Sequence, residues 1–146
     1  MLARASARRR LAAAPSSKFG VIVLDAFTSD AIPVHLLTSE ALDLYLDRLA
    51  PDGVLAFNVS NKHVAVAPVL ARLAGTHGLV AIEQFDRVRA DAAEGKSPSD
   101  WILMARNRTD LAPLIDDPRW KTPRVSSSTP LWTDDYSNLL AVLTWQ

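Results

Sequence analysis

Cysteine is absent from this chain of 146 residues, and only three histidines occur in it. Without cysteine the chain can have neither a disulfide framework nor thiol-based metal or redox chemistry. The absence agrees with a reducing compartment, and we expect a cytoplasmic protein. His63 and His77 stand alone, without the spacing of metal ligands, so the sequence predicts no metal site.

Long apolar runs and a net charge are also lacking. No apolar run approaches the roughly 20 residues that a membrane span needs, so we expect no membrane span in this chain. Basic and acidic side chains number 16 each, and this balance gives no overall attraction to nucleic acid or anionic lipid. The four tryptophans are scattered and form no stacking platform for bases, so we expect no nucleic-acid partner.

What is present is typical of one globular domain. Hydrophobic residues make up 49% of the chain and charged residues 22%, and the length suits a single compact core. Residues 1–18 are rich in arginine and alanine and contain no acid. We expect this segment to be a helix remnant or disordered, with an organelle transit peptide as the alternative, and we assign the domain to residues 19–146.

The most informative pattern is an apolar run that ends in an acid. Residues 21–24 are Val, Ile, Val and Leu, which predicts a strand covered on both faces, as in a parallel sheet. Asp25 follows at the carboxyl end of this strand, where open α/β sheets bind their ligands. An acid there is costly to bury unless it is paired or in use. Asp25 is therefore a candidate site residue, with a turn-forming aspartate as the alternative.

Alternating helix and strand patterns follow. Thr38 is the expected cap of a helix whose apolar residues are spaced at helical intervals, and Pro51-Asp52-Gly53 is expected to end it. A second helix is predicted over residues 64–74, and further strands over residues 54–59, 79–82 and 101–105. This alternation predicts right-handed crossovers and a largely parallel sheet.

Three stretches of the chain share the pattern of one family: Leu24-Asp25-Ala-Phe-Thr-Ser-Asp30-Ala-Ile-Pro33 with His35-Leu-Leu-Thr38, then Leu49-Ala-Pro51-Asp-Gly53-Val-Leu, then Trp132-Thr-Asp-Asp135-Tyr-Ser-Asn138. From about Phe19 onward the chain resembles the spermidine synthase (polyamine aminopropyltransferase) family, in particular its bacterial spermidine-synthase-like domains. The resemblance implies an α/β fold: a partial Rossmann-like sheet of the class I methyltransferase type, mostly parallel and lacking the first strands.

The resemblance also implies roles for individual residues. Asp25 matches the general base that takes a proton from the acceptor amine, which then attacks the aminopropyl carbon of decarboxylated S-adenosylmethionine. Asp30 resembles the acid that holds the cationic diamine, although four residues separate the two acids here and two in the family. Asp135 and Tyr136 are expected to border the pocket of a putrescine-like polyamine, with a solvated turn as the alternative of equal weight.

For the donor molecule, the resemblance places Ser6, Ala7 and Asp25 at contacts with the nucleoside, with Ser6 where the family has an acid. No tightly bound cofactor is expected, and decarboxylated S-adenosylmethionine would be a co-substrate. The glycine-rich turn and the acid of the first two strands have no counterpart. The chain thus looks like the second half of the domain, which leaves the strand at residues 21–24 as a sheet edge and predicts a homo-oligomer.

Three functions stay open at this point. The first is aminopropyl transfer to an amine acceptor, as in polyamine biosynthesis, impaired in so short a chain. The second is a non-catalytic remnant or a module that depends on a partner chain. The third is an S-adenosylmethionine-dependent methyltransferase on the same fold.

Overall fold

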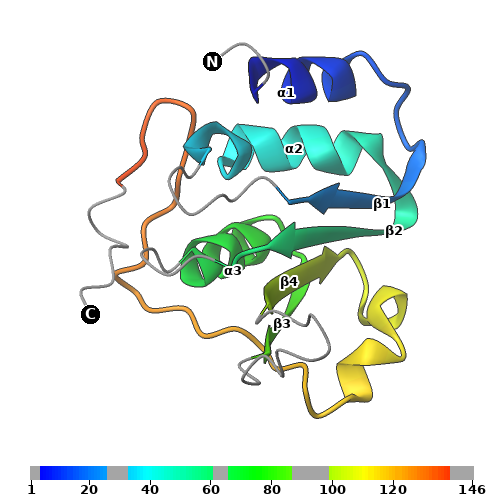
Figure 1. Cartoon of the computed structure of the whole chain (residues 1–146), viewed down its shortest axis with the longest axis vertical. Coiled ribbons are helices and arrows are strands. Elements are labelled where there is room, and N and C mark those ends of the chain that lie inside the picture. The colour runs from blue at the N-terminus through cyan, green and yellow to red at the C-terminus, as the bar shows by residue number, and fades with distance from the viewer. Residues whose placement is uncertain (1–3, 26–32, 61–65, 87–98, 139–146) are drawn as a thin grey trace, which may run out of the picture.

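The computed structural model describes residues 4–25, 33–60, 66–86 and 99–138, with side chains from Arg8 onward. Its helices are α1 (Arg4–Ala12), α2 (Ser39–Arg48) and α3 (Ala67–Thr76), and its strands are β1 (Phe19–Leu24), β2 (Leu49–Asn58), β3 (Val80–Asp86) and β4 (Ser99–Ala105) (Figure 1). Three short 3-10 helices are η1 (Val34–Leu36), η2 (Arg108–Leu111) and η3 (Leu114–Asp116). None of the described helices is long and apolar enough to cross a membrane.

The four described strands form one mixed sheet in the order β1-β2-β4-β3. β1 and β2 are parallel, whereas β4 runs antiparallel to both of its neighbours. The α/β class is confirmed, and so is the mostly parallel arrangement of the described strands: β1, β2 and β3 run in one direction, and β4 runs against them. Two consecutive strands that pair in parallel need a long crossover connection between them, usually a helix. The polar sequence between β3 and β4, residues 87–98, has no helical periodicity, which agrees with the antiparallel pairing of these two strands.

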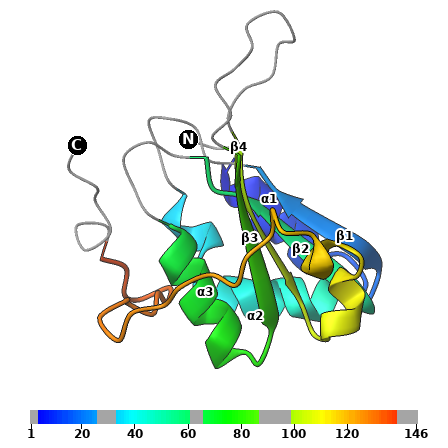
Figure 2. The same ribbon diagram turned by 90° about the horizontal axis from the view of Figure 1, so that it is seen from below.

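α2 and α3 build the main core on one face of the sheet. The sheet contributes Leu55 and Phe57 from β2 and Ile102 and Met104 from β4, all nearly or completely buried. On the opposite face, a smaller cluster around Ile82, Ala105 and Leu111 lies under the η2–η3 segment. Figure 2 shows α3 on one side of β3 and β4 and the η2–η3 segment on the other.

β1 is covered on one face only. Leu24 is buried in the main core and Ile22 packs against it, whereas Val21 and Val23 point the other way and are 59% and 57% exposed. The prediction of a strand covered on both faces is therefore wrong. An apolar run without alternation shows that both faces of a strand are suited to burial. It does not show that the described part of the chain contains a segment that packs on each face.

Local signals placed the helices well. Thr38 caps α2 as predicted, because its side-chain oxygen accepts a hydrogen bond from the backbone N–H of Ala41 at 3.2 Å. α3 begins at Ala67 with a proline in its first turn, and residues 61–65 lie outside the described chain. α1 packs beside α2, where the guanidinium of Arg48 donates to the carbonyls of Leu11 at 3.1 Å and Ala12 at 2.7 Å.

The Pro51-Asp52-Gly53 segment belongs to a bulge at the start of β2. Phe19 pairs with Leu49 and Val21 pairs with Val54, so one residue of β1 lies opposite four residues of β2. The sequence predicted a turn that ends the preceding helix, whereas α2 already ends at Arg48 and this segment lies within β2.

Candidate functional site

Asp25 lies at the carboxyl ends of β1 and β2, where the sequence placed a candidate site. Because the two strands are parallel, the residue after β1 comes beside the last residue of β2. The Asp25 side chain is exposed, and its Oδ1 accepts a hydrogen bond from Asn58 Nδ2 at 2.8 Å. Figure 1 shows these strand ends on the same side of the molecule as the beginning of α2. The carboxylate is thus open to a ligand and held from one side.

Asn58 is held in turn by Ser60. Asn58 Oδ1 accepts hydrogen bonds from the backbone N–H of Ser60 at 3.0 Å and from its hydroxyl at 2.6 Å. Ser60 Oγ accepts a further bond from the backbone N–H of Asp100, at 2.8 Å. Sequence reasoning did not select Asn58 or Ser60, although a polar residue that ends a second apolar strand was the available signal.

Three residues assigned by the resemblance cannot be placed as side chains. Asp30 lies outside the described residues. Ser6 and Ala7 belong to the backbone of α1, and their side chains are not described. Their roles in holding a diamine or a nucleoside therefore stay predictions.

In the 132–138 segment, Trp132 is buried in the main core and its carbonyl accepts a hydrogen bond from the backbone N–H of Ser39 at 2.9 Å, and Asp134 makes further polar contacts. Its carboxylate receives a two-pronged ion pair from Arg8 of α1, with both N–O distances at 2.9 Å, and a hydrogen bond from the Thr38 hydroxyl at 2.7 Å. Its backbone N–H donates to Glu40 at 2.9 Å. This cluster joins α1, the first turn of α2 and a segment more than 90 residues further along the chain. The hydrogen bond from Arg8 lowers the pKa of Asp134, and the same bond raises the pKa of Arg8.

Asp135 and Tyr136 are exposed beside this cluster. The backbone N–H of Thr133 donates to the carbonyl of Tyr136 at 2.8 Å, which closes a tight turn, and Tyr136 is 56% exposed. Among the described residues, no hydrogen bond or ion pair joins this turn to Asp25. Figure 1 shows that the turn lies on the same side of the molecule as the ends of β1 and β2.

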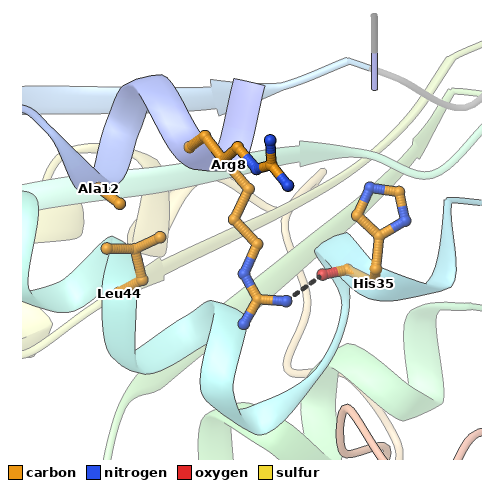
Figure 3. Close-up of a pocket in the computed structure, with 5 residues that line it drawn as sticks. Arg8, Ala12, His35 and Leu44 are labelled. Carbon is orange, nitrogen blue, oxygen red and sulfur yellow. Dashed lines mark hydrogen bonds between the residues drawn. The ribbon is translucent and has the colours of Figure 1, made fainter. Parts of the chain in front are cut away.

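A hollow of about 370 Å³ lies between α1 and the start of α2, lined by Arg8, Arg9, Ala12, His35 and Leu44. Figure 3 shows Arg8 reaching from α1 across this hollow to the main-chain oxygen of His35, at 3.2 Å. Its guanidinium also carries the ion pair to Asp134, so the positive charge is already compensated. Asp25 does not line the hollow. Within the described residues, no group of three or more His, Asp or Glu side chains could hold a metal ion.

The class that this architecture defines is a partial Rossmann-like α/β sheet of the methyltransferase type. Two features carry this assignment: the parallel pair β1–β2 with helices on one face, and the antiparallel strand β4 inserted beside β2. In such open sheets, ligands bind at the carboxyl ends of the strands, where Asp25 lies.

Comparison with solved structures agrees with this class. The chain is similar to a probable spermidine synthase from Corynebacterium glutamicum ATCC 13032, with a TM-score of 0.55 and 20% sequence identity over 91% of this chain. It also matches MnmC2 from Aquifex aeolicus, with a TM-score of 0.45 and 16% identity over 75% of this chain. The alignments span 53% and 33% of those two chains, respectively. No protein-family model and no curated protein matches the sequence. At 20% identity, the likeness to the probable spermidine synthase shows the fold alone.

Proposed function

We propose that this chain carries the amine-acceptor side of an aminopropyl-transfer site, with Asp25 as the general base. One observation carries the proposal: the exposed Asp25 carboxylate lies at the carboxyl end of a parallel strand and is held there by Asn58. The fold, which is similar to that of a probable spermidine synthase, supports it.

The chemistry requires an acid in this place. An amine is not nucleophilic while it is protonated, so a carboxylate within hydrogen-bonding reach must accept its proton as attack begins. The amine nitrogen then bonds to the aminopropyl carbon, the bond from that carbon to the sulfonium sulfur breaks, and its electron pair stays on sulfur. The products are an extended polyamine and 5′-methylthioadenosine. In this proposal Asp30 binds the distant ammonium group of a putrescine-like acceptor, and Asp135 and Tyr136 border it.

On the donor side of the site, the proposal rests on the family resemblance. Decarboxylated S-adenosylmethionine would act as co-substrate, with Ser6 and Ala7 in α1 beside its nucleoside. In the same helix, Arg8 is already bound to Asp134 and is not available to a ligand without breaking that ion pair.

A second candidate is a module that works only with a partner chain. The exposed side chains of Val21 and Val23 on the edge strand β1 favour it, because this part of the sheet offers an uncovered apolar face. A methyltransferase would share the fold and is distinguished by its donor.

The test is calorimetric titration of the purified chain with decarboxylated S-adenosylmethionine, S-adenosylmethionine and 5′-methylthioadenosine, followed by transfer assays with putrescine and spermidine. Asp25→Asn is the test variant. Asp52→Asn is its matched control, because Asp52 is also exposed but lies in the bulge at the opposite end of β2. Aminopropyl transfer that Asp25→Asn abolishes and Asp52→Asn retains would support the proposal. Methyl transfer would establish the methyltransferase, and no binding of any donor would leave the partner-dependent module.

A further inference from the structure

We propose that Asn58 and Ser60 form a positioning pair that holds the Asp25 carboxylate in one orientation. The pair lies at the end of β2, beside the start of β4, and neither residue belongs to the three stretches that carry the family resemblance. The inference rests on the proposed function only in its claim that this orientation serves proton transfer.

The orientation of the Asn58 amide follows from its partners. A backbone N–H can only donate, so the atom of Asn58 that lies 3.0 Å from Ser60 N must be the amide oxygen. The Ser60 hydroxyl oxygen accepts from the backbone N–H of Asp100, which leaves the hydroxyl proton for that same amide oxygen at 2.6 Å. With its oxygen occupied by two donors, the amide must present its NH₂ group to Asp25.

The orientation of the Asn58 amide determines which oxygen of the Asp25 carboxylate is hydrogen-bonded and which is left for a ligand. Asn58 Nδ2 donates to Oδ1 of Asp25 at 2.8 Å, so the carboxyl group is fixed through one oxygen. Among the described residues, no donor reaches Oδ2, so in this part of the chain Oδ2 is left for an incoming amine. A side chain that is exposed and bound at one oxygen gains its orientation from the neighbour that binds it, and small misplacements of a reacting group cost rate steeply.

The main chain supports the pair. Ser60 follows β2 directly, and the backbone N–H of Val59 donates to the carbonyl of Asp100 at 2.7 Å, which keeps the end of β2 beside the start of β4. Ser60 is therefore held between the end of β2 and the start of β4, and its hydroxyl donates to Asn58 from this fixed position.

The experiment measures the side-chain rotamer of Asp25 by NMR scalar couplings in the full chain, labelled with ¹³C and ¹⁵N. Asn58→Ala and Ser60→Ala are the test variants, and Ser60→Thr retains the hydroxyl. Asn107→Ala is the matched control, because Asn107 Nδ2 donates to Asp110 at 3.1 Å in the same kind of amide–carboxylate pair outside the site. We expect one Asp25 rotamer in the wild-type chain, Ser60→Thr and Asn107→Ala, and averaged couplings in Asn58→Ala and Ser60→Ala.

A single Asp25 rotamer in both alanine variants, or averaging in the wild-type chain, would overturn the proposal. If Asn58→Ala does not fold, Ser60→Ala decides alone, since it removes the two hydrogen bonds of the hydroxyl and keeps those of the Ser60 and Val59 backbone N–H groups. Where the chain transfers aminopropyl groups, the same two variants should lower kcat by about tenfold to a hundredfold, with KM changed by less than about twofold. Absence of transfer in the wild-type chain would contradict the proposed function, while the couplings would still decide the positioning role.

Discussion

Replacing Gly53 with alanine gives the sharpest test of the bulge at the start of β2. A Cβ atom at this position would lie 2.6 Å from Cγ and 2.8 Å from Cδ1 of Leu49, and 3.0 Å from the carbonyl oxygen of Ala50. Non-bonded carbons prefer about 3.5–4.0 Å, so atoms must move apart. Leu49 is completely buried and cannot swing into solvent, and the Ala50 oxygen accepts a hydrogen bond from Arg106 at 2.7 Å. We expect Gly53→Ala to lower the free energy of unfolding by about 1–3 kcal/mol.

The matched control is Gly75→Ala in the last turn of α3, where an added Cβ meets no atom within 4 Å apart from its chain neighbours and the backbone of its own helix. Alanine is favoured over glycine in helices by about 0.5–1 kcal/mol, so the same substitution should leave stability unchanged or raise it. Urea denaturation followed by circular dichroism measures both variants. With a slope of about 1–3 kcal/mol per molar urea, the Gly53→Ala midpoint should fall by roughly 1 M. A Gly53→Ala chain as stable as the wild type would refute the argument that the bulge has no room for a side chain.

Two further predictions concern the Asp134 cluster and the β1 edge. Asp134→Asn should lower the free energy of unfolding by no more than about 1 kcal/mol near pH 6.5, since Asp134 is 42% exposed and solvent screens its pair with Arg8. The pKa of Asp134 is lowered in the folded chain, so the carboxylate stabilises the fold above its unfolded pKa of about 3.9, and this contribution is lost as pH falls through the folded pKa. Urea titrations at pH 6.5 and about pH 3 should therefore show that the wild type and the variant differ less in their free energy of unfolding at the lower pH. A difference that is the same at both pH values would contradict the stabilising role of the Asp134 carboxylate. The wild-type chain should self-associate through the β1 edge at protein concentrations on the order of tens of micromolar. A double variant with Val21→Lys and Val23→Lys should suppress this association. A wild-type chain that light scattering shows to be monomeric would contradict self-association through the β1 edge.

The helices and the candidate base could be predicted because their signals are local. Thr38 caps α2 through a bond to a residue three positions away, and the apolar spacing after it describes one face of that same helix. Asp25 follows its strand directly, so the end of the apolar run was enough to locate it at the carboxyl edge of the sheet. In each case the interacting groups are neighbours along the chain, and the spacing of residue types contains the geometry.

The remaining features depend on which segments become neighbours in space. That Asn58 meets Asp25 requires β1 and β2 to be adjacent and parallel, and that Arg8 meets Asp134 requires α1 and the 132–138 segment to meet across the start of α2. The antiparallel insertion of β4 beside β2 left no trace in the apolar pattern, because a buried strand reads the same in either direction. The sequence by itself therefore determined the elements and the position of the acid. Only the tertiary structure decided what holds that acid and which strand face stays bare, because contacts between distant residues are set by packing and not by spacing along the chain.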